Sequence, residues 1–237
     1  MPGVPFMPAL DSAEDLSIVE LFKGLSEGQL AKVASLLHRK TFHPGSNLMM
    51  AQQTGEVVYI ILSGSVKICL DREDGTEVII AILGPGDTVG EMSLIDNTNR
   101  CANVMTLEDS MLLWMDKGAF QECLRTMQPM SFNLFRILAQ RLRLANEQIQ
   151  ALAAMELESR VARQLLAFAL RYGKKSPHGE VAIPLRLTQS DLAALVGASR
   201  ERINQVMVAY RERKYLSVDS RHHVTILNQQ ALAHRCA

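Results

Sequence analysis

The sequence predicts an α+β protein in which an N-terminal β-roll of the jelly-roll type is joined by a long helix to a C-terminal winged helix-turn-helix. Three observations predict this organisation. Between about residues 40 and 115 the hydrophobic pattern has a period of two, as in strands. After residue 129 apolar residues recur at steps of three and four, as in a coiled coil. Residues 187–218 then combine two short capped helices with a glycine turn.

These patterns divide the 237 residues into four segments. We expect a flexible tail at 1–15, a β-roll domain with flanking helices at 16–128, a dimerisation helix with its hinge at 129–157, and a winged helix-turn-helix domain at 158–237. The start of the chain lacks the basic and apolar regions of a signal peptide, and no apolar run is long enough to span a membrane. The four cysteines are scattered without metal-ligand spacing. We therefore expect a cytoplasmic protein with no metal site and no membrane partner.

The predicted β-roll begins with helical spacing at 16–38, where Ser26 and Gln29 have the spacing of a capping box. Short strands are then expected at 57–64, 65–71, 76–84 and 110–116, separated by glycine-containing or acidic turns. Many short strands at even spacing are typical of a sandwich, jelly roll or small barrel.

The long helix has the 3.5-residue repeat of a two-stranded coiled coil. Its predicted dimer interface consists of Phe135, Leu138, Leu142, Ala145, Ile149 and Leu152. The alternative is a helix packed on its own barrel, which usually has a broader apolar stripe with a period of 3.6. The repeat ends near 156–158, which predicts a hinge there.

Charge is unevenly distributed along the chain. Residues 1–130 contain 17 acidic and 9 basic residues, whereas residues 131–237 contain 8 acidic and 16 basic residues. This distribution suggests that the C-terminal part approaches a polyanion. The alternative is an ordinary solvated basic face.

The segment 187–218 predicts the helix-turn-helix in detail. Thr188 and Ser199 are expected N-caps, and Gly197 supplies the left-handed residue of the turn between the helices. The inward residues of the two helices are Leu192, Leu195, Val196, Ile203, Val206 or Met207, and Tyr210. Residues 215–227 alternate around a short turn and predict a β-hairpin wing.

The outward face of the second helix has side chains that suit the edges of bases in the DNA major groove. Arginine can pair with guanine, glutamate can accept from cytosine, and asparagine or glutamine can bind adenine. We expect the DNA-binding residues to be Thr188, Gln189, Ser199, Arg200, Glu201, Asn204 and Gln205. The alternative is a solvated face on an ordinary helical hairpin.

Over nearly its whole length the chain resembles the Crp/Fnr family of bacterial transcription regulators. The resemblance rests on the order of the segments and on three motifs, YIILSGSVKI (59–68), LAQRLRLANEQ (138–148) and GASRER (197–202). It implies a homodimer with a small ligand in each roll and a two-fold symmetric promoter site. RNA polymerase is a further possible partner.

Within this resemblance, VGEMSLIDNTNRCANV (89–104) resembles the phosphate-binding cassette of cyclic-nucleotide-binding domains. The resemblance implies that Arg100 binds the cyclic phosphate and Glu91 a ribose hydroxyl. The expected ligand-binding residues are Gly90, Glu91, Met92, Ser93, Arg100, Cys101 and Asn146. The alternative is a structural loop whose arginine pairs with Glu91 or Asp96.

Three departures from the family pattern bear on the effector and the operator. Cys101 replaces a hydroxyl residue, and Ala145 and Asn146 replace the Thr-Ser pair that recognises adenine. Cyclic AMP is the family default, cyclic GMP or cyclic di-GMP would suit Asn146, and a ligand-independent regulator is a further alternative. Gln205 replaces an arginine, which predicts a preference shifted away from guanine at its base.

Two other classes of protein are less consistent with the sequence. A jelly-roll enzyme would need a His/Glu metal cluster in the roll, where His43 alone is available, and no catalytic arrangement is legible. We therefore expect no enzyme activity and no cofactor. A nucleotide-sensing regulatory subunit acting on a protein partner would not need a basic reading helix.

Overall fold

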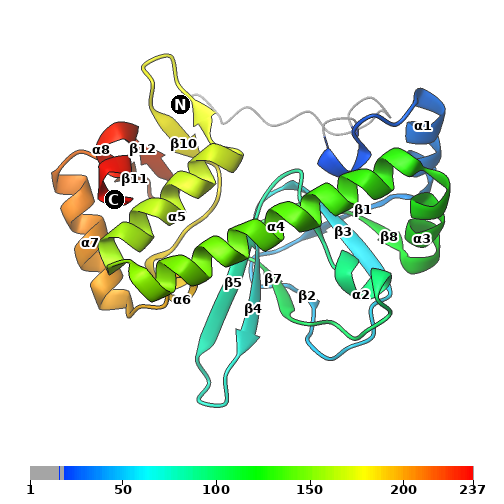
Figure 1. The fold of residues 1–237 in the computed structure, drawn as a ribbon, viewed down its shortest axis with the longest axis horizontal. Helices are drawn as coiled ribbons and strands as arrows, with labels where there is room; N and C mark the ends of the chain where they lie inside the picture. The colour runs from blue at the N-terminus through cyan, green and yellow to red at the C-terminus, as the bar shows by residue number, and fades with distance from the viewer. Residues whose placement is uncertain (1–15, 17–18, 237) are drawn as a thin grey trace. The chain divides into compact units, whose positions relative to one another are not determined.

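The computed structural model describes residue 16 and residues 19–236, so the tail predicted at 1–15 lies outside the described residues. Contacts divide the chain into two compact units, Met1–Ser63 with Pro85–Arg143 and Gly64–Gly84 with Leu144–Ala237. Figure 1 shows the elements of both. The predicted α+β class is confirmed, with a β-sheet domain, a long helix and a C-terminal helix-turn-helix.

The first unit is built on antiparallel strands. Its four-stranded sheet has the order β1 (His38–Phe42), β8 (Ser110–Asp116), β3 (Val57–Ser63) and β6 (Thr88–Val89). A second pairing joins β2 (Asn47–Met49) to β7 (Asn103–Thr106). The sequence pattern did not predict β1, because four of its five side chains are exposed and its hydrogen bonds come from β8.

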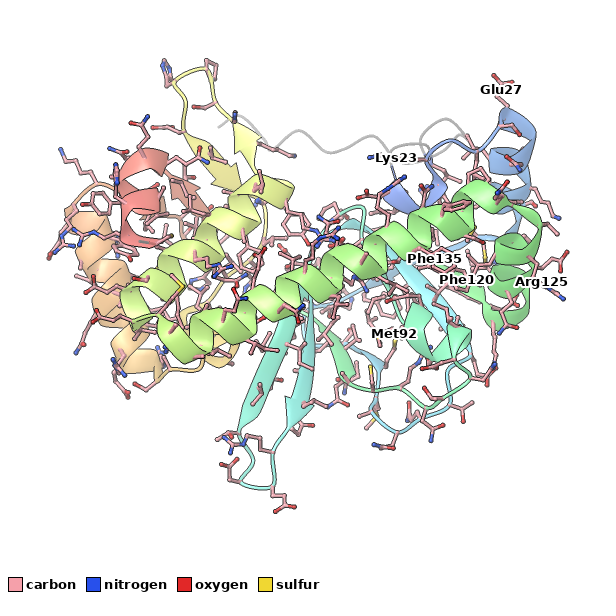
Figure 2. The ribbon with its side chains drawn as sticks, in the orientation of Figure 1. Lys23, Glu27, Met92, Phe120, Arg125 and Phe135 are labelled. Atoms are coloured by element: carbon pink, nitrogen blue, oxygen red, sulfur yellow. The ribbon has the colours of Figure 1, made fainter. Side chains whose placement is uncertain are left out.

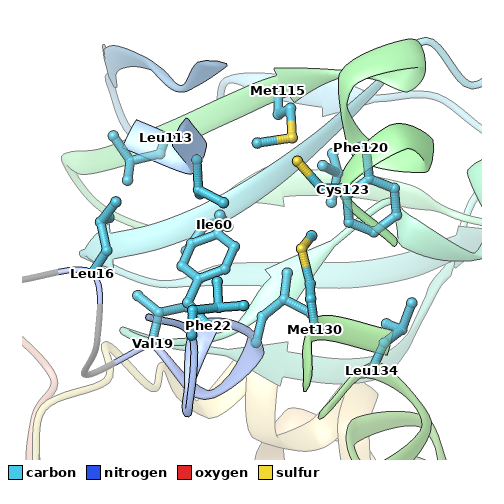
Figure 3. Close-up of a cluster of buried hydrophobic side chains, with 14 of the residues drawn as sticks. Leu16, Val19, Phe22, Ile60, Leu113, Met115, Phe120, Cys123, Met130 and Leu134 are labelled. Atoms are coloured by element: carbon cyan, nitrogen blue, oxygen red, sulfur yellow. The ribbon is translucent and has the colours of Figure 1, made fainter. Parts of the chain in front are cut away.

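Helices cover this sheet and close its core. They are η2 (Glu20–Phe22), α1 (Glu27–Leu36), α2 (Glu91–Ile95), α3 (Lys117–Thr126) and the first part of α4 (Gln128–Ala154). Figure 3 shows Phe22, Ile60, Phe120 and Met130 meeting in one cluster, where each is at most 1% exposed. The first turn of α4 tolerates Pro129, because its N–H would have no partner within the helix.

The N-terminal helical prediction is half right. Ser26 and Gln29 form the predicted capping box at the start of α1. Before it, the described residues 19–25 contain the 3₁₀ turn η2 rather than an α-helix. Val19 provides no side-chain cap there, and Gly24 reverses the chain with a φ of +77°.

The second unit contains the helix-turn-helix and a separate hairpin. Its helical elements are the end of α4, α5 (Leu157–Tyr172), α6 (Gln189–Val196), α7 (Arg200–Glu212), α8 (Gln229–Ala233) and η3 (His234–Cys236). Its antiparallel sheet has the order β11 (Leu216–Val218), β12 (Val224–Ile226), β10 (Val181–Ile183) and β9 (Lys174–Lys175). The predicted wing is therefore present as β11 and β12.

The hairpin of this unit pairs β4 (Val66–Asp71) with β5 (Glu77–Leu83), and β5 packs on α6. Gly84 follows β5 at a point of close approach. A Cβ there would lie 2.5 Å from Leu185 Cδ2 and 3.3 Å from the Tyr172 ring, so glycine permits this packing.

The break between α4 and α5 lies slightly before the predicted hinge at 156–158. α4 ends at Ala154 and α5 begins at Leu157, with Glu156 as an extended N-cap. Leu157 is buried and is the first residue of α5, so the break itself is Met155-Glu156. None of the helices in the described part of the chain combines the length and the apolar character of a membrane span.

Candidate functional site

In the first unit, the segment between β6 and β7 forms a compact cradle around an arginine. Gly90 has a φ of +91° and precedes the first turn of α2. A Cβ at this position would lie 2.3 Å from Met49 Cε and 2.7 Å from Arg100 Nη1. A Cβ on Gly55 would lie 2.3 Å from Ser93 Oγ. Two glycines therefore make room for the Arg100 guanidinium, and the role of Gly55 had no signal in the sequence pattern.

Arg100 lies inside this cradle with 6% of its surface exposed. Its Nη1 donates to Gly90 O and, at 2.8 Å, to Ser93 Oγ, and its Nη2 donates to Val57 O. Burial lowers the pKa of the Arg100 guanidinium from its ordinary value. Three of its five N–H groups are used, and the rest can donate to an anion.

Glu91, the first residue of α2, is 2% exposed and pairs with an arginine of the long helix. Arg141 Nη1 donates to Glu91 Oε1 at 2.6 Å, and Arg141 Nη2 donates to Thr88 O. Arg141 was not among the residues predicted to belong to the site. The sequence signal that could have identified Arg141 is its place in the LAQRLRLANEQ motif, about one helical turn before Ala145.

Three buried polar atoms without a hydrogen-bond partner gather at this pair. Among the residues that the structure describes, they are Thr88 Oγ1, Glu91 Oε2 and Arg141 Nε. A buried polar group left unpaired costs about 1–3 kcal/mol. Their convergence beside Arg100 fits a ligand that has both hydroxyl groups and an anionic group.

The other predicted ligand residues lie in different surroundings. Ser93 is buried against Arg100, whereas Met92 is 50% exposed and Cys101 is also exposed. Figure 2 shows Met92. Asn146 is exposed on the part of α4 that belongs to the second unit, and its contact with a ligand remains a prediction.

The predicted dimer interface on α4 is largely exposed. Phe135, Leu142 and Ile149 are 63%, 63% and 64% exposed, and Leu152 and Ala145 are exposed as well. Leu138 is partly buried against the core of the first unit. Water-exposed apolar side chains repeating along one helix are typical of an interface with another chain.

In the second unit, local caps position the two helices of the helix-turn-helix. Thr188 Oγ1 accepts from Asp191 N at 3.1 Å, and Ser199 Oγ accepts from Arg202 N at 3.4 Å. Between the helices, Gly197 has a φ of +67°. Both predicted caps and the predicted left-handed glycine are therefore present. The inward residues Ile203, Val206, Met207 and Tyr210 are all buried.

The opposite face of α7 is open to solvent. Arg200, Glu201, Asn204 and Gln205 are exposed, as predicted for a surface that reaches DNA. Gln189, at the start of α6, donates from Nε2 to Asn204 Oδ1 at 2.8 Å. The roles of these side chains in DNA binding remain predictions.

Two side chains from other helices hold the C-terminal end of α6. Gln148 of α4 donates from Nε2 to Leu195 O at 3.0 Å, and Arg160 of α5 donates from Nε to Val196 O at 3.1 Å. The last carbonyl groups of a helix have no partner within it. Gln148 and Arg160 therefore stabilise the turn of the helix-turn-helix, a role that no sequence pattern predicted.

Residues 39–127 match the family described as "Cyclic nucleotide-binding domain", and residues 159–235 match the "Crp-like helix-turn-helix domain". The "CRP-like cAMP-activated global transcriptional regulator" of Mycobacterium tuberculosis is 32% identical over 94% of this chain and 98% of its own length. The chain belongs to the Crp/Fnr family of transcription regulators. Its relatives in this family are regulators rather than enzymes, in agreement with the expected lack of enzyme activity.

Two solved structures share the fold. FixK2 from Bradyrhizobium japonicum has a TM-score of 0.74 at 19% identity, covering 85% of this chain and 98% of its own. The c-di-GMP responsive regulator CLP from Xanthomonas campestris has a TM-score of 0.65 at 22% identity, covering 85% and 99%. Membership of the Crp/Fnr family supports an effector of the cyclic nucleotide class and a DNA partner.

Proposed function

We propose that this Crp/Fnr regulator is a homodimer whose binding to promoter DNA is controlled by a cyclic nucleotide, with cyclic AMP as the first candidate. The observation that carries the proposal is the buried, unpaired Glu91 Oε2 beside the buried Arg100 cation. A carboxylate oxygen can accept a hydroxyl proton, and an arginine can bind a phosphate. A cyclic nucleotide offers both groups close together.

Different residues would bind different groups of the effector. Arg100 would bind the cyclic phosphate, with Ser93 and the N–H groups that follow Gly90 as neighbours. Glu91, oriented by Arg141, would accept from a ribose hydroxyl. Asn146 would meet the base, and Met92 and Cys101 would border the site.

The identity of the effector rests on two further observations. The Mycobacterium tuberculosis relative is named as cAMP-activated, which supports cyclic AMP. The Xanthomonas regulator is named as c-di-GMP responsive, and Asn146 in place of a hydroxyl residue is compatible with a guanine-containing messenger. Cyclic di-GMP is therefore the second candidate.

The exposed apolar residues of α4 would form the dimer interface. The two α7 helices would then enter successive major grooves about 34 Å apart. An effector can change DNA affinity only if it binds one state of the dimer better. We propose that the end of α4 and the Met155-Glu156 break transmit this change. A cytoplasmic location and contact with RNA polymerase are part of the same proposal.

Calorimetric titration of the purified protein with cyclic AMP, cyclic GMP and cyclic di-GMP tests the effector. Binding of cyclic AMP in the micromolar range, together with tighter binding to DNA, is the expected result. Binding of cyclic di-GMP alone would replace the proposed effector. Binding of none of the three would contradict the messenger and leave a ligand-independent regulator.

The site is tested with Arg100→Ala and Arg100→Lys, because alanine removes the charge and lysine keeps it. Arg100→Ala should weaken nucleotide binding by about 30-fold, the value of a charge-assisted hydrogen bond of ~2 kcal/mol. Arg72→Ala, in the exposed turn after β4, is the matched control and should bind normally. Normal binding by an Arg100→Ala variant that folds like the wild type would refute the site.

A further inference from the structure

Two amide side chains form a pair on the outer surface of the helix-turn-helix. Gln189 is the first residue of α6 and Asn204 lies in the second turn of α7. Gln189 Nε2 donates to Asn204 Oδ1 at 2.8 Å. The capping box of Thr188 fixes the backbone beside Gln189, and the Ser199 cap fixes the start of α7. The pair is thus set by two helix starts rather than by a flexible loop.

Asn204 occupies the middle of the exposed face of α7. It follows Arg200 by four residues and Glu201 by three, and residues at these separations are neighbours on a helix surface. Gln205 lies to one side, where it lines a hollow of about 580 Å³ with Arg160 of α5. Asn204 is therefore a neighbour of Arg200 and Glu201, two of the side chains expected to contact bases.

The pairing limits what Asn204 can offer to a base. An amide has one acceptor end and one donor end. Because Oδ1 is turned toward Gln189, the opposite end of the amide, Nδ2, is the one presented to an outside partner. In the major groove guanine presents two acceptors, N7 and O6, whereas adenine presents the acceptor N7 beside the donor N6. An Asn204 held with Nδ2 outward suits guanine, and an Asn204 free to present both ends of its amide suits adenine.

We infer that Gln189 is a specificity-determining residue that acts through Asn204. It turns the donor end of the Asn204 amide toward DNA, so the base facing Asn204 is selected for guanine over adenine. This inference rests on the proposed entry of α7 into the major groove. Gln189 itself is a positioning residue, because its effect on the base passes through Asn204.

Substitutions of Gln189 can reverse the orientation or preserve it. Lysine can only donate, so Gln189→Lys should keep the donor end of Asn204 outward and retain guanine. Ionised glutamate can only accept, so Gln189→Glu should draw Nδ2 inward, turn Oδ1 outward, and favour adenine or cytosine. Gln189→Ala should release Asn204 and favour adenine. The added charges change overall affinity, so the ratio between bases is the readout.

The experiment selects DNA from a library of randomised two-fold symmetric sites with the full-length protein and cyclic AMP, followed by sequencing. Asn204→Ala identifies the position that Asn204 meets, because the preference there should disappear. Glu201→Ala should alter a different position. At the Asn204 position, the guanine-to-adenine ratio should change by about tenfold between Gln189→Lys and Gln189→Glu.

Equal base preferences for Gln189→Lys and Gln189→Glu, or no position altered by Asn204→Ala, would overturn the inference while leaving the proposed function intact. Enrichment of no sequence by the wild-type protein would contradict the proposed function, and the specificity role with it. Thermal unfolding of each variant should match the wild type, because Asn204 is exposed and Gln189 is only partly buried.

Discussion

Arg141 and Glu91 form an ion pair of 2.6 Å between Nη1 and Oε1, although they lie 50 residues apart in the chain. The side chains are 21% and 3% exposed. The pair joins the long helix to the first residue of α2 in the predicted cassette. The segment expected to bind the effector and the helix expected to form the dimer are therefore connected by a direct ion pair.

Replacing Arg141 with methionine should destabilise the protein strongly. The change leaves a buried carboxylate without its partner, and breaking a buried pair in this way costs about 3–5 kcal/mol. Urea denaturation measures the loss in the free energy of unfolding. Arg143→Met, on the exposed surface of the same helix, is the control.

A double variant separates the effect of the unpaired charge on stability from the effect of lost packing. Adding Glu91→Met to Arg141→Met should recover most of the stability, because an apolar pair of similar volume can replace a buried ion pair. Equal unfolding free energies for Arg141→Met and Arg143→Met would show that the pair does not stabilise the protein.

Gln148→Glu should weaken the link between effector and DNA. The variant keeps the size of the side chain but places an acceptor against Leu195 O, at the negative end of the α6 dipole. The cyclic AMP-dependent gain in DNA affinity should fall at least about fivefold, or ~1 kcal/mol. Fluorescence anisotropy with labelled operator DNA, with and without cyclic AMP, measures this gain.

Two variants control for charge and position. Gln148→Lys retains a donor and should keep the gain, whereas Gln150→Glu adds the same charge at an exposed position two residues later. If Gln148→Glu and Gln150→Glu have the same gain as the wild type, the contact with Leu195 has no part in the response.

The exposed apolar residues of α4 should determine the oligomeric state. Combining Leu142→Glu with Ile149→Glu places charges in the predicted dimer interface. The expected weakening of the dimer is about 3 kcal/mol, roughly 100-fold in the dissociation constant. Sedimentation equilibrium measures the mass. Leu170→Glu, at a side chain of α5 that is 88% exposed, is the control. A double variant that is still a dimer would contradict the predicted dimer interface.

Local hydrogen bonds in the cassette loop lower the pKa of the Asp96 carboxyl. Asp96 Oδ1 accepts from Thr98 Oγ1 at 2.7 Å and from Thr98 N at 3.0 Å. The Thr98 hydroxyl is the main cause that lowers the pKa of the Asp96 carboxyl from its ordinary value of 3.8. Because the folded pKa is the lower one, this turn contributes stability above the unfolded pKa and loses it as the pH falls through the folded pKa.

Thr98→Val should raise the pKa of Asp96 toward its ordinary value, because valine cannot donate the hydroxyl hydrogen bond. Carbon-13 NMR of the side-chain carboxyl groups follows the titration. An unchanged Asp96 titration in Thr98→Val would mean that the backbone N–H alone causes the shift.

The β1 strand and the η2 turn are two elements that the sequence pattern could not predict. β1 has no alternating apolar face, and its position is decided by pairing with β8, far along the chain. Residues 16–25 have helical spacing, but the turn η2 at Glu20–Phe22 starts after Val19, which provides no side-chain cap. Propensity and periodicity describe a segment alone, whereas these two outcomes depend on neighbours.

Interactions between residues a few positions apart were predictable from the sequence itself. The caps Ser26, Thr188 and Ser199 and the left-handed Gly197 depend on side chains and backbone within one helical turn. The exposed face of α7 follows from the same 3.6-residue period. The helix-turn-helix could therefore be predicted from local residue patterns, and the resemblance of 89–104 to a known cassette indicated where the proposed ligand site lies.

The tertiary structure alone decided the contacts that cross long stretches of chain. Glu91 with Arg141, Gln148 with Leu195, and Gln189 with Asn204 are separated by 50, 47 and 15 residues. No local pattern specifies such partners, because each requires a backbone placed by packing elsewhere in the fold. The sequence thus indicated the candidate residues for nucleotide and DNA binding, and the fold determined how their side chains are oriented.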